Sequence, residues 1–330
     1  MTIRDVTRAY CEKNDLLASV SYFGTFGFYF LTLAAAIAVF EQTALMIALA
    51  VINALAGVRL YVLQHDCGHH SLFSKRWMND LAGYAASTFT LTPYRVMQFN
   101  HNEHHRYLGD LEARRAGEIH TMTLSEWQAA GFWQRLSYRL YRNPVFLIPL
   151  GGIFVYALRY RWPKNTVAVG MWGVVAHDLA LAVWIGALWL MAGPPGVIIY
   201  AITVFVAACT GVFLVYLQHN FEDTYWDRRP DLRHDLAALQ GSSALDLGWL
   251  FDLATGNIAY HDIHHFNANI PSYRLRKCHR AIRDEFGLPV INWPEALRSF
   301  TLKLWDEEAG RLVPFPRHKS RPRPGISAGA

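Results

Sequence analysis

The 330-residue sequence is poor in charged residues and in cysteine. Only 17% of its residues are charged, against about 25% in an average soluble domain. Because 52% of the residues are hydrophobic, an intrinsically disordered chain is excluded. Four cysteines are too few for a small protein held together by disulfides. Histidine is abundant, with 15 residues, and this excess needs a chemical explanation.

Four long apolar runs carry most of the hydrophobic residues. Two of them contain no charged residue, and the other two contain one each. A helix needs about 20 apolar residues to cross the hydrocarbon core of a bilayer. Buried helices of a large soluble protein are the alternative, but those are usually shorter and amphipathic. We therefore predict transmembrane helices at residues 19–40, 44–63, 167–191 and 196–217.

Short links join these runs into two pairs, which predicts two transmembrane hairpins. Neither link, 41–43 or 192–195, contains any of the 31 lysine and arginine residues, and such residues concentrate in cytoplasmic loops. We therefore expect both termini and residues 64–166 and 218–310 on the cytoplasmic side, at the inner membrane if the cell is bacterial. The mixed charges of the first residues and the length of the first run argue against a signal peptide.

The predicted fold class is an all-α integral membrane protein with four transmembrane helices and a cytoplasmic helical cap. Residues 1–310 form one membrane domain, and residues 311–330, rich in Pro, Arg and Gly, form a disordered tail. The apolar stretches 81–93 and 144–158 are too short to span, so we expect interfacial or re-entrant segments. Residues 126–142 combine aromatic and arginine side chains, which suits a helix on an anionic membrane surface or one packed on the cap.

The histidines gather in short motifs. HDCGHH begins at His65, HNEHH at His101 and HDIHH at His261, while His219 stands alone in YLQHNFED. On a helix, positions i, i+3 and i+4 share one face, so each HxxHH directs three imidazoles toward one point. Because His65 and His219 each follow the cytoplasmic end of a predicted span, all of these motifs can meet on one side of the membrane.

Nine imidazoles in such an arrangement predict a metal centre. Neutral imidazole is a ligand for Fe, Zn, Cu and Ni, and nine ligands suit two ions rather than one. An all-nitrogen site for two metals points to dioxygen chemistry, with iron as the metal. Asp66, Glu103 and Asp262 neighbour the histidines and could fix ligand tautomers, or could be solvated helix residues. Asn257, four positions before His261, could orient a ligand or cap the helix.

These motifs resemble the three histidine boxes of the membrane fatty acid desaturases, in the same order and at similar intervals. The stretches QHNFED, GNIAYHDIHH and WQRLSYRLYRNP are similar to its bacterial acyl-lipid branch, so the resemblance covers about residues 40–275. It implies a non-haem di-iron centre, O₂ as co-substrate and insertion of a cis double bond into a fatty acyl chain. The implied ligands are His65, His69, His101, His104, His105, His219, His261, His264 and His265, with His70 as the alternative to His69.

The resemblance also implies the partners. The substrate would be a lipid or an acyl thioester among membrane lipids, and nothing indicates nucleic acid. No HPGG haem-binding signature is present, so the electron donor is expected to be a separate protein of the ferredoxin or cytochrome b5 type. The net charge of +5 fits an anionic lipid surface and an acidic carrier.

Other functions share part of this pattern. A hydroxylase or ketolase acting on an alkane, sphingolipid, sterol or carotenoid could use the same boxes, whereas the flanking stretches favour desaturation. A metal transporter needs polar residues across the bilayer, and three of the four runs have no charge at mid-depth.

His177 and Asp178 lie inside the third run, where we expect either pairing with a neighbouring helix or a role near the acyl chain. The remaining histidines are expected at the surface: His120, His234, His279 and His318.

Overall fold

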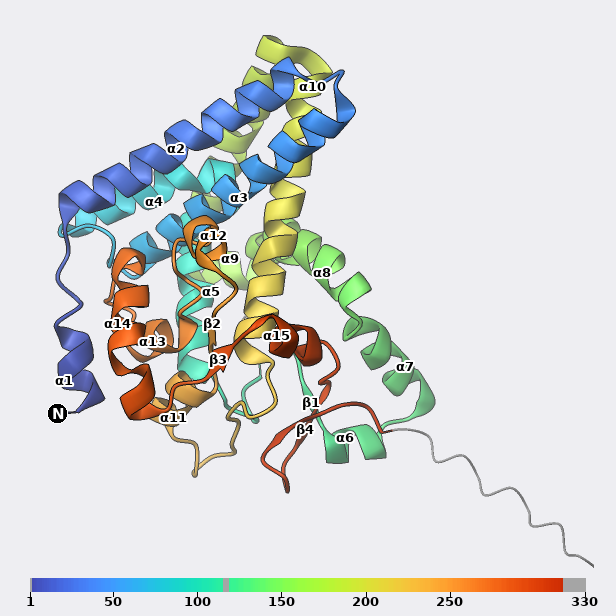
Figure 1. The fold of residues 1–330 in the computed structure, drawn as a ribbon. Helices are drawn as coiled ribbons and strands as arrows, with labels where there is room; N and C mark the ends of the chain where they lie inside the picture. The colour runs from blue at the N-terminus through green and yellow to red at the C-terminus, as the bar shows by residue number, and fades with distance from the viewer. Residues whose placement is uncertain (1, 115–118, 317–330) are drawn as a thin grey trace, which may run out of the picture.

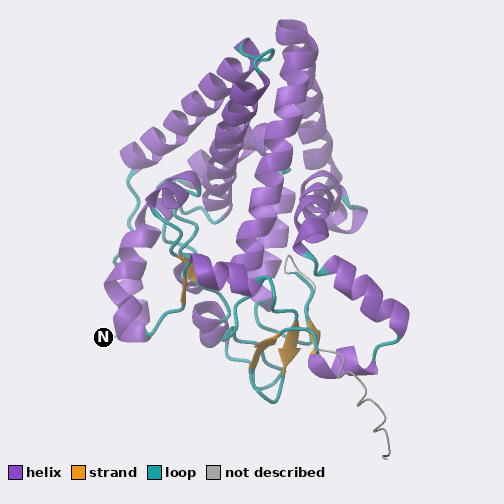
Figure 2. Ribbon diagram, turned by 45° about the vertical axis from the view of Figure 1, so that its right-hand side comes forward, coloured by secondary structure: helices purple, strands orange, loops and turns teal. Residues whose placement is uncertain are grey.

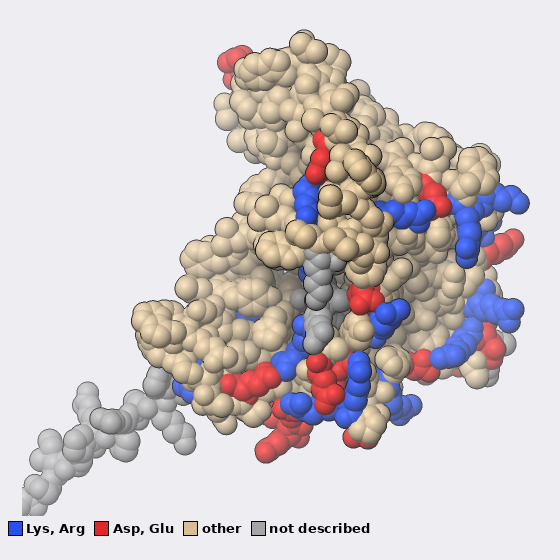
Figure 3. All heavy atoms as spheres, turned by 180° about the vertical axis from the view of Figure 1, so that it is seen from behind, with Lys and Arg blue, Asp and Glu red and all other residues tan. Residues whose placement is uncertain are grey.

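Long helices form one end of the molecule, and shorter helices with two small sheets form the other (Figures 1 and 2). The structure is a computed structural model, and it describes residues 2–114 and 119–316. Lys, Arg, Asp and Glu side chains gather mainly on the end that holds the short elements (Figure 3). This asymmetry matches an apolar bundle that carries a polar cap.

Three helices of the described residues are long and apolar enough to cross a membrane: α2 (Asp15–Ala38), α3 (Thr43–Gly68) and α10 (Met171–His219). Helix α10 is broken at Gly193, which has φ 62° and ψ −152° and is followed by two prolines. The rings of Trp184 and Tyr200 lie 6.3 Å apart, whereas 16 residues of a straight helix would separate them by about 24 Å. The two arms of α10 therefore fold back on each other.

A buried asparagine ties the long helices together. The side-chain amide of Asn53 in α3 donates to the Tyr29 carbonyl (2.6 Å) and to the Thr32 hydroxyl (2.8 Å), both in α2. Its carbonyl oxygen accepts from the hydroxyl of Thr203 in α10 (2.9 Å). Hydrogen bonds of this kind join helices where water does not compete for the polar groups. These hydrogen bonds thus fix how α2, α3 and α10 are aligned along their lengths.

The predicted short apolar stretches are helical. Residues 81–90 fall in α4 (Arg76–Thr90), and Leu91, in a left-handed conformation, caps the helix before residues 92–93 lead into the next one. Residues 144–158 form α8 (Pro144–Ile153) and a π-helical turn, η1 (Phe154–Leu158). The segment from Pro144 to Arg161 is bent by 73° from the preceding α7, a geometry found in a broken span or a re-entrant loop.

The other helices build the cap. Within residues 126–142, the ring of Trp127 is buried under Arg135 and Arg139, while Phe132 and Trp133 are exposed. This region therefore packs on the cap and also presents aromatic side chains outward. The elements are α1 (Ile3–Arg8), α5 (Tyr94–Tyr107), α6 (Leu124–Ala129), α7 (Phe132–Tyr141), η2 (Arg159–Arg161), α9 (Pro163–Val169), α11 (His234–Gln240), α12 (Trp249–Ala254), α13 (His261–Phe266), α14 (Ser272–Phe286) and α15 (Trp293–Ser299).

Two small sheets correct the all-helical prediction. Strand β4 (Leu304–Asp306) pairs in parallel with β1 (Met122–Thr123) and antiparallel with β5 (Arg311–Val313), and β2 (Ala244–Leu245) pairs with β3 (Val290–Ile291). Strands of two or three residues are too short to show an alternating pattern in sequence.

The predicted tail at 311–330 is also corrected, because its first residues belong to β5. The side chain of Leu312 is buried with Trp226 and Trp305, and this packing orders the strand. Residues 317–330, and His318 with them, lie outside the described part of the chain.

Candidate metal centre

Four helices bring the histidine motifs together at the junction between the long helices and the cap. His65 lies in the last turn of α3, His69 follows that helix directly, and His219 ends α10. Helix α5 carries the HNEHH motif and α13 begins at the first histidine of HDIHH. All nine predicted ligands converge, but in two groups. The prediction that each HxxHH motif directs its three imidazoles toward one point is wrong, because His104 and His264 each join a different group from the other two histidines of their motif.

The first group contains five imidazoles: His65, His69, His101, His105 and His264. Its ligand atoms all lie within 4.8 Å of one another. The Nε2 of His101 is 2.7 Å from that of His65, 2.8 Å from that of His105 and 3.4 Å from that of His264. The residues come from three different helices, so the tertiary fold is required to assemble the group.

The second group contains four imidazoles: His104, His219, His261 and His265. The Nε2 of His265 lies 3.1 Å from that of His104 and 3.0 Å from that of His261. His219 is oriented by its other nitrogen, because its Nδ1–H donates to the Gly241 carbonyl oxygen at 3.0 Å. This bond fixes the tautomer and leaves the Nε2 lone pair of His219 available for a metal.

Both groups fit metal ions. Metal–imidazole bonds of about 2.0–2.1 Å hold neighbouring ligand nitrogens about 3 Å apart, which is the spacing found here. Five facing nitrogens cannot all satisfy each other by sharing protons, because each neutral imidazole has one N–H and one lone pair. Within the described residues, the Nε2 atoms of His69 and His219 are buried and have no hydrogen-bond partner. One cation in each group would satisfy them.

Burial also keeps the histidines of both groups in the neutral form, which is the form that binds a metal. Burial lowers the pKa of His101, His105, His261, His264 and His265 well below the usual 6.5, and neighbouring imidazoles add to the effect. The cause is the cost of placing a positive charge in a poorly solvated site. These side chains are therefore neutral at neutral pH, as ligation requires.

His70 lies apart from both groups. Its Nε2 is 3.1 Å from the Asp80 carboxylate, and its backbone adopts φ 53° as the chain leaves α3. The alternative pairing of His65 with His70 thus has no geometric support, and His69 takes the place in the first group.

Asp66 is buried beside His65, with its Oδ1 3.4 Å from His65 Nδ1, while its Oδ2 accepts from the Ser272 N–H at 2.7 Å.

Two of the expected orienting residues act elsewhere. Glu103 forms an ion pair with Arg106 at 2.9 Å, one turn further along α5, and no hydrogen bond joins it to a histidine within the described residues. Asn257 lies in a turn with φ 65°, before α13 begins, and its amide donates to the Ser272 carbonyl at 3.2 Å. The prediction that Asn257 shares a helical face with His261 is wrong, because the helix starts only at His261.

Asp262 has a partner that sequence analysis missed. His279, expected at the surface, is 1% exposed, and its Nδ1 lies 3.0 Å from one Asp262 carboxylate oxygen and 3.2 Å from the other. The 17-residue separation left no sequence pattern that joins them. One signal was available, because position 279 falls on the same face of α14 as the buried Leu275 and Ile282. His120 and His234 are exposed, as expected.

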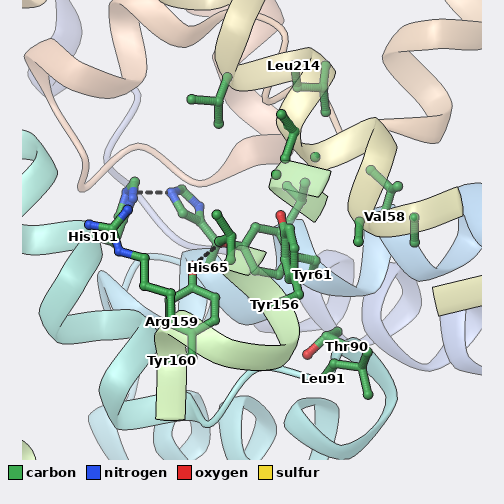
Figure 4. A pocket seen from close by; sticks show the side chains of 18 of the residues that line it. Val58, Tyr61, His65, Thr90, Leu91, His101, Tyr156, Arg159, Tyr160 and Leu214 are labelled. Carbon is green, nitrogen blue, oxygen red and sulfur yellow. Dashed lines mark hydrogen bonds between the residues drawn. The ribbon is translucent and has the colours of Figure 1, made fainter. Parts of the chain in front are cut away.

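An apolar cavity of about 260 Å³ adjoins both groups (Figure 4). His65, His101, His104 and His261 line one part of it. Along α10 its lining runs from Thr203 to Gln218, a length of about 22 Å at 1.5 Å per residue. Tyr61, Tyr156 and Tyr160 face the space near the histidines in Figure 4. The cavity is therefore long and narrow and passes beside the candidate metals.

Aromatic residues pack at the end of the cavity that lies among the long helices. Phe89 lines this end, and its ring packs against Phe30 at 5.3 Å and Trp184 at 5.2 Å.

Nearby, Arg161 binds the two polar residues of the third apolar run, with 2.8 Å to Asp178 and 3.1 Å to His177. His177 and Asp178 thus pair with a neighbouring segment of the chain, which was one of the two roles expected for them.

The family is decided by comparison with known proteins. A model of the fatty acid desaturase domain matches residues 42–294. The chain belongs to the fatty acid desaturase family. This desaturase is therefore an oxidoreductase, and its histidine groups are compatible with metal binding.

Individual relatives agree with this. The desaturase is 32% identical to a fatty acid desaturase of Bacillus subtilis, over 94% of this chain and 88% of the relative. It is 27% identical to the sn-1 oleoyl-lipid 12-desaturase of Synechocystis, over 79% of this chain and 74% of the relative. It is also 27% identical to the sn-1 acyl-lipid omega-3 desaturase (ferredoxin) of Nostoc, over 69% of this chain and 64% of the relative.

Proposed function

We propose that this protein inserts a cis double bond into a fatty acyl chain at a di-iron centre, with O₂ and two electrons from a separate carrier. The observation that carries the proposal is the contact between two histidine groups and one long apolar cavity. An apolar slot of this shape suits an unbranched hydrocarbon chain. Acyl-lipid desaturases among the relatives support a membrane lipid as the substrate.

The proposed membrane topology has four crossings: α2, α3 and the two arms of α10. The ends of α3 and α10 carry His65 and His219 into the same site, so both ends face one side. The bent segment of α7, α8 and η1 leaves and returns on that side, which makes it re-entrant. Since the links at 41–43 and 192–195 lack lysine and arginine, the histidine side and both termini are assigned to the cytoplasm.

The proposed ligands are the five histidines of the first group for one iron and the four of the second for the other. When bound, the two irons would supply activation of O₂ for hydrogen removal from an unactivated methylene. The overall reaction converts –CH₂–CH₂–, O₂, two electrons and two protons into –CH=CH– and two water molecules. The Gly241 carbonyl accepts a hydrogen bond from His219 and holds this ligand in place before a metal binds.

The chain's own contribution beyond ligation is positioning. The cavity walls are mostly apolar and would hold one pair of methylenes beside His65, His101, His104 and His261. Gly211 lets α10 approach Tyr156, because a Cβ at this position would lie 2.2 Å from the Tyr156 hydroxyl. A narrow, rigid slot restricts which carbons reach the metals, and this restriction gives the product its double-bond position.

The test is expression with iron and a ferredoxin reducing system in a host of known lipid composition. Fatty acids are analysed by gas chromatography–mass spectrometry, with His264→Ala as the inactive control. New unsaturated chains in the wild type alone would support the proposal. Hydroxylated chains, or lipids that match those of the control, would overturn it.

A further inference from the structure

We propose that the outer face of α14 is the docking surface for an acidic, one-electron carrier protein. The inference rests on the proposed function, since an oxygen-dependent desaturase draws its two electrons from such a carrier. It adds the location of the surface and the residues that form it.

Helix α14 carries an unusual density of positive charge. Five of its fifteen residues are arginine or lysine, against two acidic residues at its end. Arg276, Arg280 and Arg283 share one helical face by their i, i+4 and i+7 spacing, with Lys277 beside them. Arg276 forms an ion pair with Asp252 at 3.1 Å and Arg283 with Asp284 at 3.0 Å. Lys277 and Arg280 are exposed, and neither forms an ion pair with any part of the chain that the structure describes. Their charges are therefore available to a partner.

The opposite face of α14 touches the metal-site helix. His279 is adjacent to Arg280 in sequence, and its ring contacts the Asp262 carboxylate at 3.0 Å. Asp262 follows His261 of the second histidine group and lies two residues before His264 of the first. A carrier bound at Arg280 would thus be separated from both groups only by buried, tightly packed side chains.

The direction of α14 favours a protein over a lipid surface. Its second residue, Tyr273, accepts a hydrogen bond from the Asn14 N–H at 2.9 Å, beside the start of α2. From there the helix runs away from the long apolar helices (Figure 1). Lys277, Arg280 and Arg283 lie beyond the first turn, increasingly far from the long helices that the proposed bilayer surrounds. A basic stripe in this direction suits an acidic protein surface.

The electron balance fits repeated docking of one carrier. Each double bond consumes two electrons, so two reduced carriers are oxidised by one electron each per turnover. These electrons, two protons and the two hydrogens removed from the substrate reduce O₂ to two water molecules. Fast exchange of carriers is needed between the two transfers, and a surface attraction based on exposed charges provides rapid association and release.

The test compares two matched variants in detergent. Lys277→Glu with Arg280→Glu alters the proposed surface, and Lys75→Glu with Arg76→Glu alters an exposed pair at the start of α4 that has no ion-pair partner within the described chain. Binding of a plant-type [2Fe–2S] ferredoxin is measured by surface plasmon resonance. We expect the dissociation constant to rise about tenfold or more for the α14 variant and about twofold or less for the control.

Two further readouts separate the possible failures. Iron content and thermal stability should match the wild type in both variants, which excludes a folding defect. Equal weakening in both variants, unchanged binding in the α14 variant, or no ferredoxin binding by the wild type would overturn the docking surface. A single turnover of the wild type tests the proposed function separately. The enzyme is reduced without O₂ by dithionite and methyl viologen, freed of excess reductant and then mixed with O₂, and this reduction needs no docking site.

Discussion

The buried carboxylate of Asp262 lies 3.0 Å from Nδ1 of His279, and this contact joins the third histidine motif to α14. Asp262 is fully buried and His279 nearly so. A carboxylate in such a place is costly unless a partner satisfies it. His279 therefore belongs to the support of the candidate metal centre, although it lies outside the three motifs.

The first prediction concerns this support. His279→Ala should lower the free energy of unfolding by about 1–3 kcal/mol, because the Asp262 carboxylate loses a buried partner. Thermal unfolding in detergent, followed by circular dichroism, measures the change. The exposed His234→Ala serves as the control and should stay close to the wild type. Equal stability of the two variants would show that the contact contributes nothing.

A second prediction distinguishes the two candidates in the first motif. His69→Ala should lose about half of the bound iron, since one group loses a ligand whose Nε2 has no other partner in the described chain. His70→Ala should retain it, because His70 contacts Asp80 instead. Inductively coupled plasma mass spectrometry gives the iron content. Loss of iron in the His70 variant alone would reverse the assignment.

Much of the site was predictable because helical spacing is local. The i, i+3 and i+4 pattern brought the histidines of each motif close to the site, but it did not predict that His104 and His264 join the other group from their motif neighbours. The apolar runs gave the approximate bounds of α2, α3 and the arms of α10. Asn257 was misplaced because the start of α13 depends on a left-handed turn held by contacts with α14. His279 and the two small sheets were missed because each depends on pairing between distant segments.

The third prediction addresses the aromatic end of the cavity, where Phe89 lies. Phe89→Ala should let longer acyl chains enter, because removal of the ring extends the cavity toward Phe30 and Trp184. The measurement is the chain-length profile of the unsaturated products by gas chromatography–mass spectrometry. Phe28→Ala, an exposed position on α2, is the control and should keep the wild-type profile. Identical profiles for both variants would mean that Phe89 does not limit the chain.

The fourth prediction concerns acid stability. In the folded protein the pKa of His101, His105, His261, His264 and His265 is well below 6.5, whereas the unfolded chain takes up protons near that value. The unfolded state therefore binds more protons as the pH falls, and the stability of the metal-free protein is present above pH 6.5 and is lost below it. Differential scanning fluorimetry of chelator-treated protein should show the melting temperature falling between about pH 7 and pH 5. A flat profile would contradict the burial of these groups.

The central claim is that two separate histidine groups each hold one iron beside the acyl cavity. The most direct measurement is the iron content per chain of the purified wild type, His264→Ala and His261→Ala. The account predicts two irons in the wild type and about one in each variant, since each substitution removes a ligand from a different group. One iron or none in the wild type, or two irons retained in both variants, would contradict it.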